Sequence, residues 1–369
     1  MRKNMLKFKE FSALLEDLLP VSVGNEEVGN IESSDTDKIK ALVAKLSPGA
    51  NALKSKITLI GYSEKEAADM IHIMEEESEE DLLVFSDYLT STSKLTIDQL
   101  ITKGDMYELF NQKLTGLSQK TLFTLFKYNV QTKSKGTGDG EVALSLLLSG
   151  GSKPLRSGDL LVNSLTYEVK GIGAKLAGQE SEVVKNPIGV RNAFDKGFSL
   201  LAQNVNLDLT KLRNGKYSYD DQHFWNFREG AWGSDYIAEL LFKKTPSGDR
   251  GKLIESIKSI YIDALSQIFP MSIKEIQKDT GSFVNNKGLV VDRSLFLQWI
   301  AKINANIYWH IHKPNGMVFL TVDSKNSSII AFPNIDSLNA AIDATEIKIS
   351  GMSFENKADR AILPGFTLK

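Results

Sequence analysis

The segment from Ser157 to Gly171 constrains the fold of this chain more than any other stretch. Polar and apolar residues alternate on both sides of a short polar centre, which is the pattern of a tight β-hairpin. Because successive side chains of a strand point to opposite faces, Glu168 and Lys170 share one face while Val169 points into a core. Asp159 begins the first strand. The sequence therefore predicts two carboxylates and one lysine at one end of a small sheet.

A third acidic residue precedes the hairpin. The glycine-rich stretch 136–140 leads into Glu141, and the apolar run 142–148 follows it. We expect Glu141 to begin a helix and its neighbour Asp139 to be a solvated loop residue. Carboxylates brought together in this way suit a divalent cation that activates water against a phosphodiester.

These features together resemble the PD-(D/E)xK nuclease superfamily, the fold of many restriction and phage endonucleases. The pair Gly158-Asp159, the hairpin and the glycine after Lys170 carry the resemblance, which covers about residues 119–185 and, more loosely, 300–335. Gly158 stands where the family name has a proline. An ordinary surface hairpin with a Glu–Lys pair and a degenerate, inactive nuclease fold are the alternatives that this pattern leaves open.

The resemblance implies a magnesium-dependent DNA endonuclease in which Mn²⁺ can substitute for Mg²⁺. The implied metal ligands are the carboxylates of Asp159, Glu168 and Glu141 and the main-chain carbonyl of Val169. Lys170 would orient or help to deprotonate the attacking water and would stabilise the charge of the transition state. The implied catalytic residues are thus Glu141, Asp159, Glu168 and Lys170.

A glycine-led loop follows the hairpin at residues 171–173. Glycine lets a backbone approach phosphates closely, although a simple strand-to-helix turn would have the same composition. We expect DNA contacts from Lys175, Gln179, Lys185 and Arg191. Since the net charge of the chain is −2, binding to DNA would need a local basic surface.

Two further groups of residues have both a functional and a plain interpretation. The aromatic stretch from Tyr217 to Trp232 fits the core of a helical subdomain or a surface that stacks on nucleic acid. His310 and His312 alternate on a strand that we expect at 306–311, where they would share a face. Such a pair can ligate a transition metal, but it is more often an ordinary half-exposed feature.

The whole pattern predicts an α/β fold, with a central mixed sheet of about five strands flanked by helices, as in a restriction-endonuclease-like core. We expect a helical N-terminal domain at 1–130 and a nuclease domain at 131–369, with a helical insertion at about 186–304. Strands at 316–323 and 328–332 would complete the sheet.

Local signals add detail to the helical half. Ser63 with Glu66 predicts a capping box, and Ser118 predicts a further helix cap. The acidic run from Glu75 to Asp81 fits a solvated helix end, and a docking or DNA-repelling surface is its alternative.

Composition narrows the class of protein. The chain of 369 residues has no cysteine, which excludes disulfides and thiolate chemistry. No apolar run reaches the ~18 residues of a membrane span, so we expect no membrane partner.

The opening Met5–Phe11 is similar to the starts of proteins from T4-like tailed bacteriophages, and Leu14-Leu15-Glu16 fits a prohead-protease site or a plain amphipathic helix. The expected partners are DNA and phage head or replication proteins. The expected location is the host cytoplasm, or the virion if the protein is packaged. The sequence leaves open whether the chain forms a homodimer. A non-catalytic virion protein and an RNA-directed or toxin-like nuclease are the competing functions.

Overall fold

The computed structural model describes most of the chain from residue 47 onwards. The described residues are 47–130, 137–153, 159–176, 186–214, 217–219, 233–267, 293–324, 327–351, 353–355, 360–362 and 364–369. The chain divides into two compact units, the first made of Met1–Gly171 with Asn315–Pro333 and the second of Ile172–Pro314 with Asn334–Lys369. The predicted boundary between residues 130 and 131 falls within the first unit, and residues 131–136 lie outside the described residues, so the predicted domain limits stay a prediction.

Short helices build the N-terminal part of the first unit. They are α3 (Pro48–Leu59), α4 (Glu64–Ile73), α5 (Glu79–Thr90), the 3₁₀ helix η1 (Ile97–Leu100), α6 (Met106–Leu109), α7 (Gln112–Thr115), α8 (Gln119–Lys127) and α9 (Glu141–Leu147). The predicted capping box is confirmed, because the Ser63 hydroxyl accepts from the amide of Glu66 and the Glu66 carboxylate accepts from the amide of Ser63. Ser118 caps α8 as predicted, accepting from the amide of Thr121. These caps satisfy amides that the first turn of a helix leaves without partners.

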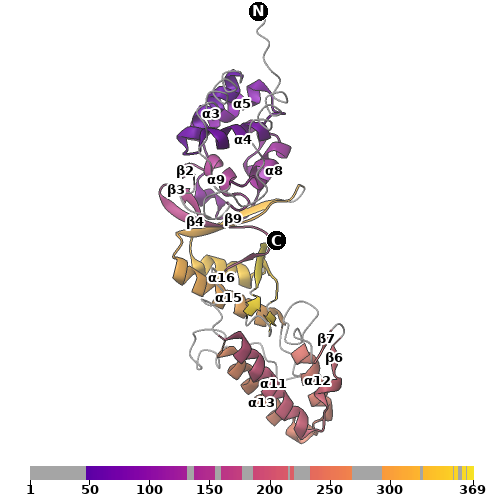
Figure 1. The fold of residues 1–369 in the computed structure, drawn as a ribbon. Helices are drawn as coiled ribbons and strands as arrows, with labels where there is room; N and C mark the ends of the chain where they lie inside the picture. The colour runs from indigo at the N-terminus through magenta and orange to yellow at the C-terminus, as the bar shows by residue number, and fades with distance from the viewer. Residues whose placement is uncertain are drawn as a thin grey trace, which may run out of the picture. The chain divides into compact units, whose positions relative to one another are not determined.

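A six-stranded mixed sheet lies against these helices (Figure 1). Its strands are β1 (Gly104–Asp105), β2 (Gly151–Ser152), β3 (Asp159–Val162), β4 (Leu165–Lys170), β8 (Gly316–Thr321) and β9 (Ser328–Phe332), in the order β1-β9-β8-β4-β3-β2. Strands β4 and β8 run parallel, whereas the other neighbours are antiparallel. The predicted α/β class, the mixed sheet and the helical N-terminal region are therefore confirmed.

The hydrophobic effect decides which face of the sheet meets the helices. Leu160, Val162 and Val169 lie in a core shared with apolar residues of the helices from α3 to α9. Fully burying one such side chain contributes roughly 1.5–3 kcal/mol. Since alternate residues of a strand face opposite ways, Glu168 and Lys170 lie on the other face.

The described part of the second unit is mainly helical. Its helices are α11 (Pro187–Asn204), η2 (Leu209–Lys211), α12 (Gly233–Lys244), η3 (Ser247–Asp249), α13 (Arg250–Leu265), α15 (Arg293–His312) and α16 (Ile335–Asp343). Helices α11 and α13 lie side by side (Figure 1), and the ring of Phe194 meets that of Tyr261 edge-on with centroids 5.2 Å apart. Of the predicted aromatic stretch, residues 220–232 lie outside the described residues.

Several short strands complete the second unit, and the sequence did not predict them. A three-stranded sheet has the order β10 (Ile347–Ile349), β13 (Gly365–Leu368) and β5 (Ala174–Lys175). In two further antiparallel pairs, β6 (Arg213–Asn214) lies beside β7 (Tyr217–Ser218) and β11 (Ser353–Glu355) lies beside β12 (Arg360–Ile362).

The predicted strand at 306–311 is wrong, because these residues belong to the helix α15. The β-branched and aromatic residues there suggested a strand, but the buried stripe of Phe296, Ile300 and Tyr308 follows a helical period. An established helix extends at low cost, so the preceding turns override local strand propensity. His310 and His312, two positions apart on a helix, therefore do not share a face.

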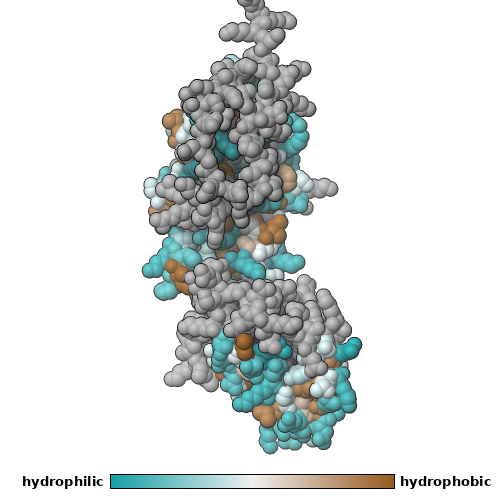
Figure 2. Space-filling model, viewed as in Figure 1, coloured by the Kyte–Doolittle hydropathy of each residue, from teal (hydrophilic) through white to brown (hydrophobic). Residues whose placement is uncertain are grey.

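In the part of the chain that the structure describes, no helix combines the length and the apolar character that crossing a membrane requires. Over the helices α11 to α13, hydrophilic residues prevail on the face seen in Figure 2 and hydrophobic ones are scattered among them. Scattered apolar side chains of this kind are ordinary on a protein surface.

Candidate functional site

The hairpin that carries the candidate residues is tight, as predicted. Strands β3 and β4 are joined by Asn163 and Ser164, whose φ angles of 51° and 66° lie in the left-handed region. Two such residues in succession give the turn whose twist matches that of antiparallel strands. The turn fixes the register, in which Asp159 stands directly opposite Glu168. The side chain of Asp159 lies outside the described residues.

Glu168 and Lys170 form an ion pair on the face away from the helical core. The Nζ of Lys170 donates to Oε2 of Glu168 at 2.6 Å, and the two side chains are 14% and 13% exposed. Between them, Val169 points to the opposite face and is buried. The predicted common face of Glu168 and Lys170 is thus confirmed.

The neighbouring strand gives this ion pair an apolar flank. In the parallel register of β4 with β8, Glu168 stands beside Met317 and Lys170 beside Phe319. Both of these apolar side chains are fully buried. Charges next to such a surface interact more strongly than charges in open water, because water is partly excluded.

Glu141 begins the helix α9, as predicted, and the backbone before it explains why. Gly140 has φ 85°, and a Cβ at this position would lie 2.5 Å from Cδ2 of Leu320, so glycine alone fits there. Leu320 follows Phe319, the register partner of Lys170. The start of α9 therefore lies over the same end of the sheet as Lys170.

Glu141 is 3% exposed and belongs to a helix whose other residues are buried in the helical core. Its Oε1 lies 2.8 Å from the place where a Cβ of Gly138 would be. Glu141 thus shares an end of the sheet with the Glu168–Lys170 pair, but it comes from the helical side. Asp139 is not simply solvated, since it accepts from Lys127 at 2.6 Å and from Asn129 at 3.4 Å.

A complete metal centre is not formed by the described side chains. Among them, no three histidine, aspartate or glutamate side chains gather closely enough to hold a metal ion. The predicted ligand set of Asp159, Glu168, Glu141 and the Val169 carbonyl includes the side chain of Asp159, which is outside the described residues. The donors are all oxygens, as Mg²⁺ prefers. The predicted magnesium site stays a prediction.

The residues predicted to contact DNA differ in their exposure and in whether the structure describes them. Lys175 is exposed on β5, whereas Gln179 and Lys185 lie outside the described residues. Arg191, on α11, has a side chain only 13% exposed, and its Nε lies 3.5 Å from Oδ2 of Asp195. In the loop before β5, the amide of Gly173 donates to the Thr367 hydroxyl at 2.8 Å, so this amide has a partner within the protein.

The acidic run has structural roles in this fold. Glu77 accepts from the amide and hydroxyl of Ser118, Glu76 pairs with Lys120, and Glu79 accepts from the amide of Gly49. These contacts tie helices of the first unit together and favour the plain interpretation of the run.

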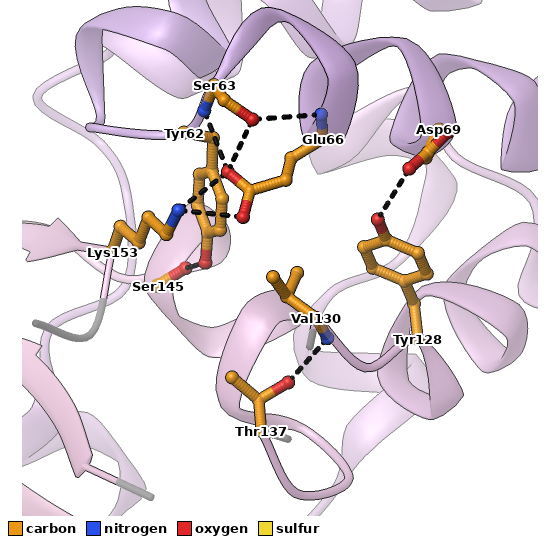
Figure 3. A network of polar contacts seen from close by, with 9 residues as sticks. All are labelled: Tyr62, Ser63, Glu66, Asp69, Tyr128, Val130, Thr137, Ser145 and Lys153. Carbon is orange, nitrogen blue, oxygen red and sulfur yellow. Dashed lines mark hydrogen bonds and ion pairs between the residues drawn. The ribbon is translucent and has the colours of Figure 1, made fainter. Parts of the chain in front are cut away.

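Sequence reasoning missed a polar network in the first unit (Figure 3). Lys153 Nζ lies 2.7 and 2.6 Å from the two carboxylate oxygens of Glu66. The hydroxyl groups of Tyr62 and Ser145 are hydrogen-bonded, with their oxygens 2.6 Å apart. Burial raises the pKa of Tyr62 above its usual range. These side chains come from segments far apart in the sequence, so no local pattern could have joined them.

A second pair in this network joins Tyr128 and Asp69, whose oxygens are 3.5 Å apart (Figure 3). Burial raises the pKa of the Asp69 carboxyl. For Glu66, burial acts in the same direction, but hydrogen bonds from Lys153 and Ser63 outweigh it and lower the pKa.

No protein-family model, curated protein or solved structure matches this chain.

Proposed function

We propose that the chain is a magnesium-dependent endonuclease that hydrolyses phosphodiester bonds in DNA, with its centre at the β3–β4 hairpin. One observation carries the proposal: Asp159 stands opposite Glu168 in the β-ladder, and Lys170 shares the face of Glu168 and contacts it. Directly opposed residues of antiparallel strands place their side chains on one face, with Cβ atoms roughly 4.5–5.5 Å apart.

The residues of the hairpin would divide the chemistry between them. Asp159 and Glu168 would hold Mg²⁺, with Glu141 approaching from the start of α9. When bound, Mg²⁺ supplies an activated water and neutralises charge on the phosphate. Lys170 would donate to the oxygen that gains negative charge, and the buried Met317 and Phe319 beside it would strengthen that interaction.

Cleavage of nucleic acid with and without metal tests this function directly. Supercoiled plasmid, linear duplex DNA, single-stranded DNA and RNA are each incubated with the protein and either Mg²⁺ or EDTA. We expect Mg²⁺-dependent nicking of DNA that is lost in Asp159→Asn and Glu168→Gln and kept in Glu66→Gln, a matched change in an ion pair elsewhere in the unit. Cleavage by Asp159→Asn at the wild-type rate would contradict the proposal.

The same experiment separates the competing functions. If the protein binds DNA but cleaves none of the substrates, with Mg²⁺ or with EDTA, a non-catalytic virion or head-associated protein is favoured. That role is also compatible with a phage source. Cleavage confined to RNA would favour an RNA-directed nuclease, because metal chemistry at a phosphate does not depend on the sugar.

A further inference from the structure

A pocket lies between the helices α15 and α16 of the second unit. Its volume is about 440 Å³, which is within the range of small-molecule sites, roughly 300–1,000 Å³. The residues that line it are Leu295, Gln298, Trp299, Lys302, Ile303, Asn306, Asn339 and Asp343. The proposed nuclease chemistry uses none of them.

The helical period explains how one pocket gathers these side chains. On α15 the lining residues recur every three or four positions from Leu295 to Asn306, so they form one stripe along the helix. On α16, Asn339 and Asp343 are four positions apart and face that stripe. Lys302 donates to Asp343 at 2.8 Å and links the two helices across the pocket.

The wall of the pocket is aromatic and amide-rich. The Trp299 side chain is mostly buried, and its ring is stacked on that of Phe296 with centroids 6.3 Å apart and planes 25° apart. Three carboxamides line the same pocket, those of Gln298, Asn306 and Asn339. An aromatic plane beside carboxamides offers stacking together with paired donors and acceptors.

One of these amides has an unmet hydrogen-bonding capacity. The Oδ1 of Asn339 is shielded from solvent, and no hydrogen-bond partner for it occurs among the described residues. A buried carbonyl oxygen without a partner is costly, and the terminal torsion of asparagine turns easily. Once this torsion turns the oxygen toward the pocket, a ligand that donates a hydrogen bond there would relieve the cost.

The charge balance of the pocket points to a neutral ligand. The Lys302 ammonium is compensated by Asp343, so a phosphate or carboxylate would find no spare positive charge there. A purely apolar ligand would leave the Asn339 oxygen without a partner. A flat, neutral ring with donors and acceptors on its edge meets both conditions.

We propose that this pocket binds a single unpaired nucleobase, held by Trp299 and read by the carboxamide of Asn339. The base could belong to a free nucleoside or to an unstacked position in a nucleic-acid strand. Bases stack on aromatic side chains, and carboxamides pair with the edges of bases. The inference goes beyond the proposed cleavage activity and does not depend on it.

Fluorescence of 2-aminopurine tests this site, because the emission of this base falls when it stacks. All binding is measured in EDTA, so the result is independent of cleavage. Three probes separate the sources of the base: the free 2-aminopurine nucleoside, a single strand that contains it and a fully paired duplex that contains it. Uncharged sugars and inorganic phosphate are added as competitors.

We expect the nucleoside or the single strand to bind with quenching and the duplex to bind more weakly. Asn339→Ala should weaken binding about tenfold, as befits a lost buried hydrogen bond, and Trp299→Phe should reduce the quenching. Gln203→Ala, which removes an exposed carboxamide on α11, is the matched control and should change nothing. Circular dichroism verifies that each variant is folded.

Three results would overturn the inference. One is no binding of any 2-aminopurine probe to the folded wild-type protein at millimolar concentration. Another is binding that Asn339→Ala and Trp299→Phe leave unchanged. The third is displacement of the nucleoside by a sugar at equal concentration, which would make the pocket a carbohydrate site.

Discussion

Two ion pairs in the first unit have the same length but different surroundings. Lys153–Glu66 and Lys170–Glu168 both have a shortest nitrogen–oxygen distance of 2.6 Å, and all four side chains are largely buried. Glu66 has further partners, because its Oε2 also accepts from the amide and hydroxyl of Ser63 in the capping box of α4. Among the described residues, Glu168 accepts from Lys170 alone.

The difference separates a structural carboxylate from an available one. Lys153 and Ser63 provide Glu66 with four hydrogen bonds, three to Oε2 and one to Oε1, so both of its oxygens are engaged. With Lys170 as its partner in the described part of the chain, Glu168 keeps capacity there for a further ligand. Burial and a short ion pair are therefore weak guides to function, whereas the number of remaining acceptor sites is informative.

The largest expected effect is on the rate of DNA cleavage, where the two lysines should differ. Lys170→Ala should lower the rate of DNA cleavage by roughly 10²–10³-fold, since a donor to developing charge acts mainly in the transition state. Lys153→Ala removes an equally short ion pair and should leave the rate per folded molecule within about twofold. Single-turnover cleavage of plasmid, normalised to folded protein, measures both.

Binding of uncleaved DNA in EDTA is the control for this comparison. It should be almost the same in the two variants. Equal losses of binding and cleavage in Lys170→Ala would show that this lysine is a plain phosphate contact, and the contrast between the two ion pairs would fail.

For the free energy of unfolding we expect the opposite order, in which the change at Glu66 has the larger effect and the change at Glu168 the smaller. Glu66→Gln should destabilise the first unit by about 1–3 kcal/mol, because charge-assisted hydrogen bonds and a helix cap are weakened together. Glu168→Gln, which loses one partner, should cost less. Hydrogen exchange of amides in α4 reports on the first unit. All four tryptophans belong to the second unit, so their fluorescence is an internal control that should not change. A larger loss in Glu168→Gln would contradict the comparison.

The sequence predicted the hairpin well because the signals there are local. Alternation along β4 assigned the faces of Glu168, Val169 and Lys170, and the turn needed only two residues. The Ser63 cap was equally accessible, since a capping box spans four residues. Local chemistry of this kind depends little on the rest of the fold.

Elsewhere the decisive contacts join distant segments, and sequence reasoning could not find them. Lys153 and Glu66 are 87 positions apart, and Tyr62 and Ser145 are 83 apart. Residues 306–311 show the same limit in another form, because the helix that precedes them determines their conformation. Tertiary context overrides short-range propensity at such places.

The smallest expected effect is the pH dependence of the same network. The pKa of Glu66 is lowered in the folded state, so its contribution to stability is present above its unfolded pKa and is lost as the pH falls through the folded value. The pKa of Asp69 is raised, so folding favours its neutral form, and that contribution is lost as the pH rises through the folded value. The cost of Glu66→Gln should therefore shrink in acid. Asp69→Asn should stabilise the folded state most near neutral pH.

Between roughly pH 7 and pH 4.5, the effect of each substitution on the free energy of unfolding should change by less than about 1 kcal/mol, because the two carboxyl groups are only partly buried. Hydrogen exchange of α4 amides at the two pH values, corrected for intrinsic exchange rates, measures them. Opposite slopes for Glu66→Gln and Asp69→Asn are expected. Parallel slopes would mean that the two carboxylates titrate as one coupled group, and Glu66 could then no longer serve as the purely structural partner in the comparison with Glu168.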